Sequence, residues 1–512
     1  MEKYKHKKYV YSMSLLLLGI VMMGCSATRL SLKEEKMIPK REFRGAWIQT
    51  VYQNEYKNMT PAEMRDDFIR KLNYLKACGI NALIFQVRPE ADAFYKSKLE
   101  PWSRFYTGTQ GLAPVGDFDL MKFLIGECHK RNIEFHAWLN PYRAGASGST
   151  TFAPSHIMNK YPGRFIKYDN LIYFDPGQPQ NRQFICNVVE DIVSRYDVDG
   201  IHLDDYFYPY PVPGVPFPDD RSFKRYGIEK GYTEATRGDW RRENVNMLIK
   251  ELNETVHSIK PWVRFGVSPF GIYRNRKSTT DDSGSFTNGM QCYDDLYADV
   301  LLWLKNGWID YNMPQIYWEI GHTAADYSVL ISWWSQHTEG RHLYIGQDVA
   351  RTMKAGQLTE KMRYERELSN IDGNCFWPAN ELLWNNKGVA DSLRRNYHRY
   401  PALVPAYTYL YNHKPKEVKD LQAEKNSEGV WLHWNADMNP MNLSSANYFV
   451  IYRFAGNERV NLNNAANIVG FTRSLSFLLP YDKKKGDFCY VVTAVDRFHN
   501  ESKKGVRVKV KL

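Results

Sequence analysis

Short apolar segments alternate with amphipathic segments along most of this chain of 512 residues. The apolar segments have the length of buried strands, and most intervals between them carry helical periodicity. Pro61 after Thr60, for example, is typical of a helix N-terminus, and Gly79 of a helix end. We expect eight strands, at residues 43–49, 80–88, 133–140, 198–205, 262–268, 308–317, 342–348 and 373–377. An eightfold strand–helix alternation predicts an α/β fold, a TIM (β/α)8 barrel over residues 41–400, with a doubly wound open sheet as the alternative.

The pattern changes after Pro401. Residues 405–512 hold no convincing helix but several alternating strands, at residues 430–434, 448–453 and 488–496. The segments W-L-H-W, Y-F-V-I-Y-R and Y-V-V-T-A-V-D resemble those of a fibronectin type III domain, which is also about 100 residues long. The resemblance implies a separate all-β sandwich, for which we expect the role of a spacer or scaffold, with direct ligand binding as the alternative.

The most informative stretch, residues 198–210, is typical of a buried strand that ends in two carboxylates and an aromatic loop. Its alternation places His202, Asp204 and Tyr206 on one face and apolar residues on the other. Because helices cover the outside of a parallel barrel, its second face also lies inside. Asp204 and Asp205 at the end of such a strand indicate a chemical site. The structural alternative is that they cap the next segment or pair with surface lysines.

Polar and aromatic side chains follow the ends of other expected strands as well. The carboxyl ends of parallel strands meet at one end of a barrel, which is where the active sites of such barrels lie. Arginine binds carboxylates through two parallel hydrogen bonds, and aromatic rings stack on sugars or pack the core. The candidate substrate-binding residues are Arg88, Trp138, Asn140, Tyr142, Arg143, His202, Tyr206, Gln315, Tyr317, Trp318 and Asp348. For the two arginines, a structural ion pair with Asp92 or Asp204 is the alternative.

Several separated motifs point to one known family. They are F-R-G-A-W (43–47), N-A-L-I-F-Q-V-R-P-E-A-D-A-F-Y (81–95), H-A-W-L-N-P-Y-R (136–143), D-G-I-H-L-D-D-Y-F-Y-P (199–209), G-V-S-P-F-G (266–271) and P-Q-I-Y-W (314–318). Together they resemble the glycosyl-hydrolase-like family 10, over residues 41–400. The resemblance implies a TIM-barrel glycoside hydrolase of the bacterial envelope. It also implies a polysaccharide partner, either the glycan strands of peptidoglycan or another N-acetyl or acidic polysaccharide.

Hydrolysis of a glycosidic bond needs two carboxyl groups beside an oxocarbenium-like transition state, one of them protonated near neutral pH. We expect Asp204 to stabilise the reacting sugar and Glu319, after the sixth strand, to donate the proton. Asp205 is adjacent in sequence and so starts on the opposite face of the strand from Asp204, where it would orient neighbouring groups and share the catalytic site. The reserve candidates are Asp348, Glu90 and Asp92. A surface ion pair is the structural alternative for Glu319.

Two other classes of function stay open at this point. A glycan-binding lipoprotein without catalysis needs only the aromatic residues and arginines, whereas an enzyme needs two nearby carboxylates. His202, Asp204 and Asp205, with His136, also fit a metal-dependent polysaccharide deacetylase, although no second histidine follows at a suitable spacing. The strand resembles the family-18 chitinase pattern D-x-x-D-x-D-x-E too, but His202 and Tyr206 replace two of its acids. A substrate-assisted reaction on an N-acetyl sugar stays open.

The first 24 residues have the pattern of a secretion signal. A lysine-rich start precedes an apolar run that is too short for a permanent membrane span. Met22-Met23-Gly24-Cys25 resembles a bacterial lipobox, which predicts a lipidated Cys25 followed by a tether over residues 25–40. A plain secreted protein is the alternative. We therefore expect a lipid-anchored protein of the cell envelope, in the outer membrane of a Gram-negative bacterium.

The net charge and the positions of the cysteines limit which partners, metals and cofactors we expect. The net charge of +11 weakly favours anionic partners such as envelope polymers, acidic glycans or a lipid surface. The sequence has no RNA-binding motif, Gly-rich phosphate loop or basic helix, so nucleic acid is not an expected partner. The six cysteines after Cys25 form no CxxC pair, and we expect them to be buried apolar residues. No spacing resembles a zinc site, and we expect no metal and no cofactor.

Overall fold

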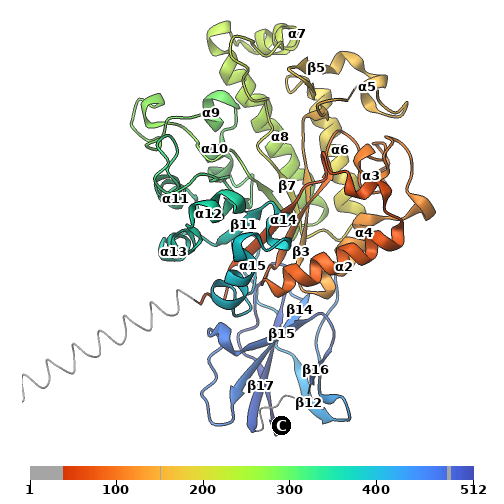
Figure 1. Cartoon of the computed structure of the whole chain (residues 1–512), viewed down its shortest axis with the longest axis vertical. Coiled ribbons are helices and arrows are strands. Elements are labelled where there is room, and N and C mark those ends of the chain that lie inside the picture. The colour runs from red at the N-terminus through yellow and green to blue at the C-terminus, as the bar shows by residue number, and fades with distance from the viewer. Residues whose placement is uncertain (1–37, 150, 481–485, 512) are drawn as a thin grey trace, which may run out of the picture.

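A computed structural model describes residues 38–149, 151–480 and 486–511 (Figure 1). Its central strands are β1 (Phe43–Ile48), β2 (Ala82–Arg88), β3 (Glu134–Leu139), β7 (Gly200–Leu203), β8 (Arg264–Val267), β9 (Tyr311–Asn312), β10 (His342–Asp348) and β11 (Gly373–Trp377). All are parallel and close into a barrel in the spatial order β1-β11-β10-β9-β8-β7-β3-β2. The predicted barrel is confirmed, and the alternative of an open sheet is wrong.

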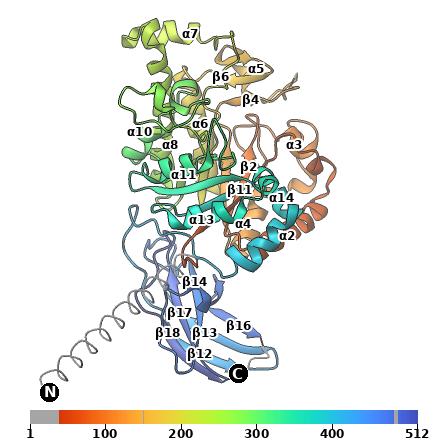
Figure 2. The same ribbon diagram turned by 60° about the vertical axis from the view of Figure 1, so that its left-hand side comes forward.

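Most of the helices surround the barrel and cover its outer surface (Figures 1 and 2). They are α2 (Pro61–Ala77), α3 (Arg104–Thr107), α4 (Leu120–Lys130), α5 (Ile157–Lys160), α6 (Pro179–Arg195), α7 (Asp220–Ser222), α8 (Arg237–Ile259), α9 (Cys292–Asp295), α10 (Val300–Lys305), α11 (Tyr327–Ser335), α12 (Val349–Ala355), α13 (Leu358–Glu367), α14 (Ala379–Leu383) and α15 (Val389–Ser392). Helix α2 begins as predicted, because Thr60 and Glu63 form a reciprocal capping box and Pro61 is the first helical residue.

Alternate positions of the barrel strands point into the barrel, where aromatic rings dominate. Trp47, Trp138, Tyr311 and Tyr344 belong to one buried cluster there. The strands leave room for these rings: a Cβ atom added at Gly266 would lie 2.1 Å from Cζ of Tyr311. The interior is therefore a packed core and not a pore, as in other barrels of this type.

The sixth strand is much shorter than the predicted segment 308–317. Only the two residues of β9 pair with β8 and β10. Pro314 lies just beyond and has no N–H to donate to a neighbouring strand, and isolated bridges then join Gln315 to Phe270 on one side and to Gly346 on the other. Residues 316–319 lie beyond the strand, so strand alternation does not determine where their side chains point.

Long loops rise above the carboxyl-terminal end of the barrel. The loop after β3 forms an antiparallel sheet of β4 (Arg143–Gly145), β6 (Leu171–Phe174) and β5 (Phe165–Tyr168). The hydroxyl of Tyr168 donates to the carbonyl oxygen of Val215 at 2.8 Å, which joins this sheet to the loop after β7. The two long loops after β3 and β7 thus support each other.

The C-terminal part is an all-β unit beneath the barrel (Figure 2). One sheet contains β12 (Lys419–Lys425), β13 (Gly429–Asn435) and β16 (Ser476–Pro480). The other contains β15 (Ile468–Thr472), β14 (Tyr448–Ala455), β17 (Asp487–Val495) and β18 (Val506–Lys511). Side chains from both sheets, Leu432 and Ile451 among them, form one buried cluster. The resemblance of this unit to a fibronectin type III domain stays a prediction.

The all-β unit and the segment before it close the amino-terminal end of the barrel. Tyr407 packs into the interior cluster, and its hydroxyl lies 2.7 Å from that of Tyr344. At the same end, Lys40 forms an ion pair with Glu501 at 2.6 Å. Among the residues that the structure describes, none of the helices has the length and apolar character needed to cross a bilayer.

Replacing Gly266 with Ala should lower the free energy of unfolding by about 1–3 kcal/mol or more, because the new methyl group would collide with the ring of Tyr311. Gly126→Ala is the matched control: Gly126 is exposed on helix α4 with nothing within 4 Å of its Cβ position. There the same change should be neutral or stabilise by up to about 1 kcal/mol. Urea unfolding of both variants measures the difference, and equal stabilities would contradict the interior packing.

Candidate active site

A cavity of about 430 Å³ lies at the carboxyl-terminal end of the barrel. Residues at or just beyond the ends of all eight strands line it: Trp47, Gln49, Val51, Tyr52, Gln86, Trp138, Arg143, Asp204, Asp205, Tyr206, Tyr210, Ser268, Phe270, Gln315, Tyr317, Trp318, Arg351 and Trp377. Both its size and its position are those of a small-molecule site in a barrel of this type.

Asp204 is a buried carboxyl group of this cavity and follows β7 directly. Its Oδ2 accepts a hydrogen bond from Nε1 of Trp138 at 3.1 Å and another from the side-chain amide of Asn140. Its Oδ1 is buried and has no hydrogen-bond partner among the described residues. Burial raises the pKa of Asp204 to about 7, with Arg143 opposing the rise and the charge of Asp205 adding to it. A carboxyl group with this pKa exchanges protons readily near neutral pH.

Asp205 lines the same cavity. Its Oδ1 accepts a hydrogen bond from Nε2 of Gln315 at 3.1 Å, and its Oδ2 accepts one from the hydroxyl of Tyr210. Burial raises the pKa of Asp205, and these two donors oppose the rise. The sequence pattern predicted that Asp204 and Asp205 start on opposite faces. That expectation fails because β7 ends at Leu203, so both carboxyl groups lie beyond the strand and line the cavity.

Two arginines bring positive charge to the cavity. Arg143 donates through Nε to a backbone carbonyl at 2.8 Å and through Nη2 to the side-chain oxygen of Asn140. Its guanidinium also lies over the ring of Tyr206, 5.3 Å from the centroid. The side chain of Arg351 is 53% exposed, and its Nε lies 3.6 Å from the carboxylate of Asp348. Arg143 is therefore fixed, whereas Arg351 has one long ion pair and a half-exposed side chain that a ligand can reach.

Aromatic rings supply most of the remaining cavity wall. The indoles of Trp47 and Trp138 each meet the indole of Trp377 edge to face, with centroids 6.5 Å and 6.0 Å apart. Tyr52, Tyr206, Tyr210, Phe270, Tyr317 and Trp318 complete the aromatic lining. Rings with an apolar face and a polar edge suit a ligand such as a sugar, which is apolar on its C–H face and polar at its hydroxyls.

Many residues predicted for the site line the cavity together. They are Trp138, Arg143, Asp204, Asp205, Tyr206, Gln315, Tyr317 and Trp318. Asn140 and His202 lie next to lining residues and contact them. Asn140 donates to Asp204, and His202 accepts a hydrogen bond from Nε1 of Trp47 at 3.2 Å. These two residues therefore hold lining residues in place without lining the cavity themselves.

Arg88, which was expected at the mouth of the barrel, lies elsewhere. The pairing of β2 with β3 shifts by one residue between Gln86 and Arg88, so alternation ends there. Gln86 lines the cavity, whereas Arg88 is fully buried and pairs with Glu100 at 2.7 Å. It also donates to the carbonyl oxygen of Pro141 at 3.1 Å. The structure therefore contains the alternative given above, a structural ion pair, and the partner of Arg88 in it is Glu100.

Glu319, which was expected to be the proton donor, is not among the residues that line the cavity. Because β9 is short, Glu319 lies in the loop beyond it. Its charge acts on Lys361, whose Nζ donates to the carbonyl oxygen of Trp318 at 2.8 Å. The position of Glu319 does not suit proton transfer to a ligand in this cavity.

The remaining predicted residues have structural surroundings outside the cavity lining. Tyr142 is fully buried. Asp348 caps helix α12 by accepting a hydrogen bond from a backbone N–H at 2.8 Å. Glu90 pairs with an arginine at 2.7 Å, and Asp92 accepts a hydrogen bond from a glutamine amide at 3.0 Å. Each carboxylate already has a partner within the protein.

Other lining residues were absent from the predicted site: Trp47, Gln49, Val51, Tyr52, Gln86, Tyr210, Ser268, Phe270, Arg351 and Trp377. Strand alternation from Phe43 through Gly45 places Trp47 inside the barrel, so this residue was available to the same reasoning. Tyr210 and Arg351 lie beyond the strand ends, where no periodicity indicates the direction of a side chain.

Neither ring nitrogen of His202 faces Asp204 or Asp205. One contacts Tyr311 and the other contacts Trp47 and Ser268, so His202 does not form the predicted metal cluster with the two carboxylates. Within residues 38–149, 151–480 and 486–511, no group of three or more His, Cys, Asp or Glu side chains is placed to hold a metal ion. The six cysteines described by the structure are buried and free.

Comparison with known proteins identifies the family. The family described as Glycosyl hydrolase-like 10 matches residues 42–363, which include every cavity residue except Trp377. The chain belongs to this family. A relative in it, the glycosyl hydrolase YngK of Bacillus subtilis (strain 168), is 37% identical over 483 residues, which are 91% of this chain and 93% of YngK. Membership of the glycosyl hydrolase-like 10 family confirms the resemblance found in the motifs, and it supports a glycosidase.

A second relative and a solved structure are also similar to this chain. The glycosyl hydrolase DigH of Escherichia coli (strain K12) is 36% identical over 325 residues, which are 59% of this chain and 72% of DigH. Among solved structures, the α-L-fucosidase isoenzyme 2 from Paenibacillus thiaminolyticus superposes with a TM-score of 0.44 at 12% identity, covering 70% of this chain and 49% of the fucosidase.

The pKa of Asp204 should respond in opposite directions to two substitutions. Arg143→Gln removes the positive charge that lowers this pKa, so the value should rise above about 7. Asp205→Asn removes the like charge, so the value should fall. Carboxyl ¹³C NMR titrations, assigned with Asp204→Asn, measure both shifts. Glu319→Gln is the control and should leave the titration unchanged, and shifts of the same sign in the first two variants would contradict the arrangement.

Proposed function

We propose that this protein is a glycosidase in which Asp204 and Asp205 are the catalytic pair. The observation that carries the proposal is the presence of two buried carboxyl groups in one aromatic cavity, one of them with a pKa of about 7. Glycosidic bond hydrolysis uses such a pair, one group as proton donor and the other as carboxylate. The assignment replaces Glu319, which lies outside the cavity.

Asp204 is the better proton donor of the two. Its Oδ2 accepts hydrogen bonds from Trp138 and Asn140, so the proton of the neutral acid resides on Oδ1. Oδ1 is buried and has no partner within the described chain, so its proton is not held by another protein group and would pass to a leaving oxygen that the bound substrate brings against it. After giving up its proton, Asp204 would act as the general base that activates the attacking water, since its pKa is close to neutral.

Asp205 is the better carboxylate. Both of its oxygens accept hydrogen bonds, one from Gln315 and one from Tyr210, and such bonds favour the ionised form. An ionised Asp205 would stabilise the positive charge that develops on the sugar in the transition state, or attack its anomeric carbon. Which of the two occurs depends on the separation of the carboxyl groups in the complex with the substrate.

The cavity supports a polysaccharide substrate with acidic or N-acetyl groups, such as a glycan strand of peptidoglycan. Its aromatic lining suits sugar rings, and Arg351 offers a half-exposed guanidinium to a carboxylate. A glycan-binding protein without catalysis would need the same aromatic residues and arginines. It would not need a buried acid with a pKa near 7, which costs folding free energy and so favours the enzyme.

We also propose that the protein is anchored in the cell envelope through a lipidated Cys25. Cys25, the signal segment of residues 1–24 and most of the predicted tether lie outside the described residues. The support is the lipobox-like Met22-Met23-Gly24-Cys25 after a basic and apolar start.

Asp204→Asn keeps the shape of the side chain and removes the acid, so turnover of glycan strands should fall roughly 100- to 10,000-fold. Aryl glycosides with acidic leaving groups should be affected far less, because they need no protonation. The loss of turnover is measured by the release of reducing ends and by the masses of the products from purified, peptide-free glycan strands. The fold should persist: the pKa of Asp204 is raised from its usual value of 3.8 to about 7, so this carboxyl group costs stability increasingly between these pH values and fully above about pH 7, and asparagine removes that cost.

Asp205→Asn should abolish turnover of both substrate types, since a carboxylate is needed whatever the leaving group. Glu319→Gln is the matched control and should keep the activity of the unmodified protein. If Asp204→Asn and Asp205→Asn bind glycan and still cleave it normally, the catalytic pair is wrong. If the unmodified protein binds strands and releases no product, the non-catalytic alternative holds.

Cys25→Ser should move the protein from the membrane fraction to the soluble fraction, because it removes the attachment site for the acyl chains. Ser26→Ala, at the next position, is the control and should leave the distribution unchanged. Mass spectrometry of the membrane-extracted protein should find an acylated Cys25 as the first residue. An N-terminus at any other residue would refute the anchor.

A further inference from the structure

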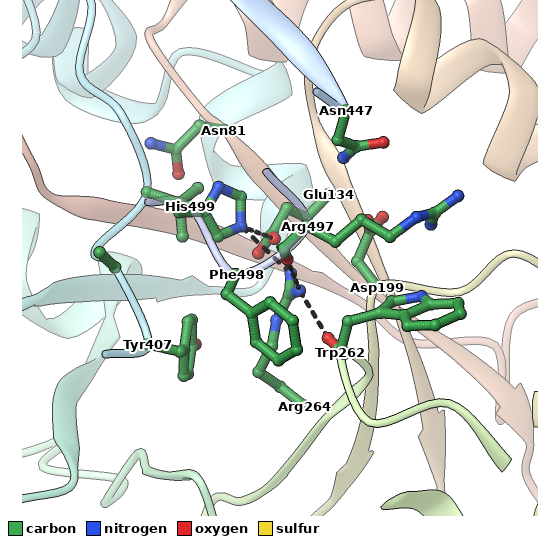
Figure 3. A network of polar contacts seen from close by, with 12 residues as sticks. Asn81, Glu134, Asp199, Trp262, Arg264, Tyr407, Asn447, Arg497, Phe498 and His499 are labelled. Carbon is green, nitrogen blue, oxygen red and sulfur yellow. Dashed lines mark hydrogen bonds and ion pairs between the residues drawn. The ribbon is translucent and has the colours of Figure 1, made fainter. Parts of the chain in front are cut away.

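A buried polar cluster joins the C-terminal unit to the lower end of the barrel (Figure 3). Nε2 of His499, from the loop after β17, lies 2.6 Å from Oε1 of Glu134 on β3. Arg264 on β8 forms an ion pair with the same oxygen, and it donates to the carbonyl oxygens of Trp262 and Arg497 at 3.0 Å and 3.1 Å. The C-terminal unit therefore supplies a hydrogen-bond donor inside the wall of the barrel.

From Glu134 the contacts continue up the barrel axis. Its other oxygen, Oε2, lies 3.0 Å from Nε2 of His136. Nδ1 of His136 lies 2.9 Å from the hydroxyl of Tyr311, and the same hydroxyl lies 3.0 Å from Nδ1 of His202. His136, Tyr311 and His202 are all fully buried.

The row of contacts ends at the cavity. Nε2 of His202 accepts a hydrogen bond from Nε1 of Trp47 at 3.2 Å and lies 3.0 Å from the hydroxyl of Ser268. Trp47 and Ser268 both line the cavity. We name the row from His499 through Glu134, His136, Tyr311 and His202 to Trp47 and Ser268 the axial column.

The indole N–H of Trp47 determines the proton positions from His202 to His136. An indole N–H only donates, so Nε2 of His202 is an acceptor and Nδ1 carries its proton. Tyr311 therefore accepts from His202 and donates to Nδ1 of His136. The remaining proton of His136 is then on Nε2, where it meets the carboxylate of Glu134. Nε2 of His499 donates to the second oxygen of that carboxylate, because an unprotonated nitrogen would repel an oxygen anion at 2.6 Å; the contact of the same nitrogen with Nη2 of Arg264 is longer, at 3.4 Å.

The strands are shaped around the axial column. A Cβ atom at Gly200 would lie 2.4 Å from Nδ1 of His136, and one at Gly266 would lie 2.1 Å from the ring of Tyr311. Burial lowers the pKa of His136 to about 4 and that of His202 well below its usual value, so both rings stay neutral at neutral pH. Each histidine ring has to be neutral for the hydrogen bonds of the axial column to run in one direction, because a neutral imidazole has one donor and one acceptor nitrogen.

We propose that the axial column positions the cavity floor, with the C-terminal unit as its lower support. Tyr311 and His202 are positioning residues: they hold the acceptor nitrogen toward Trp47 and Ser268. The inference rests on the proposed glycosidase function for its effect on turnover. It also gives the C-terminal unit a role in the barrel itself.

Tyr311→Phe tests the proposal, because it keeps the ring and removes the hydroxyl that joins the two histidines. Nδ1 of His202 loses its acceptor, so the ring is free to change tautomer and the indole of Trp47 loses its partner. We expect kcat/KM on glycan strands to fall roughly 10-fold or more, measured well below the unfolding temperature. Tyr344→Phe is the matched control, because it removes a buried hydroxyl from a neighbouring ring whose centroid lies 5.3 Å from that of Tyr311. Within the part of the chain that the structure describes, this hydroxyl bonds only that of Tyr407, and it is not part of the axial column.

A second measurement does not depend on turnover. Imidazole ¹⁵N shifts, assigned with His202→Gln, should show His202 protonated on Nδ1 in the unmodified protein and in Tyr344→Phe. In Tyr311→Phe the Nε2-protonated form should appear. Glycan binding, followed by tryptophan fluorescence, should weaken in the same variant. His499→Gln should shift the His136 signals in the same experiment.

The outcomes separate this inference from the proposed function. If the protein binds glycan but releases no product, the tautomer and binding data still decide on the axial column. Equal kcat/KM values for Tyr311→Phe and Tyr344→Phe, with His202 protonated on Nδ1 in both, would overturn it. Unchanged His136 signals in His499→Gln would remove the C-terminal unit from the axial column.

Discussion

The interior of an eight-stranded barrel has to be filled, and here buried polar rings fill it. Each unpaired nitrogen or hydroxyl in that space would cost free energy, so the rings must satisfy one another. His136, Tyr311 and His202 do so in a row, and Gly200 and Gly266 leave the room that their rings need. A core of aliphatic side chains would fill the same volume. It would impose no direction on the hydrogen bonds beneath the cavity, whereas these rings do.

The same exclusion of water creates the chemistry above the rings. Asp204 has a raised pKa because it is buried, and Arg143 limits the rise so that the group still titrates near neutral pH. Asn140 connects these two effects, since it donates to Asp204 and accepts from Arg143. The acid therefore depends on a small set of contacts around one amide, and its neighbour Asp205 has separate donors of its own. Two adjacent carboxyl groups acquire different tendencies to ionise because their hydrogen-bond partners differ.

Strand alternation predicted the barrel and the inward direction of Trp138 and His202, because a period of two holds while a strand lasts. It failed where regular pairing stops. A bulge after Gln86 turns Arg88 away from the cavity, and the short β9 leaves Glu319 in a loop. Asp205 follows the end of β7 and lines the cavity although alternation placed it outside. The family motifs include the strand ends but contain no information on bulges, which arise from pairing between distant segments.

The contact between Lys40 and Glu501 has a consequence for access to large substrates. It holds the start of the described chain against the C-terminal unit, at the end of the barrel opposite the cavity. A lipid anchor preceding this point would attach the molecule by its closed end. The cavity would then open away from the bilayer, toward the surrounding polymer. Long glycan strands could approach the cavity from the side or from above without displacing lipid. The enzyme would act on the part of the envelope that lies within reach of its tether.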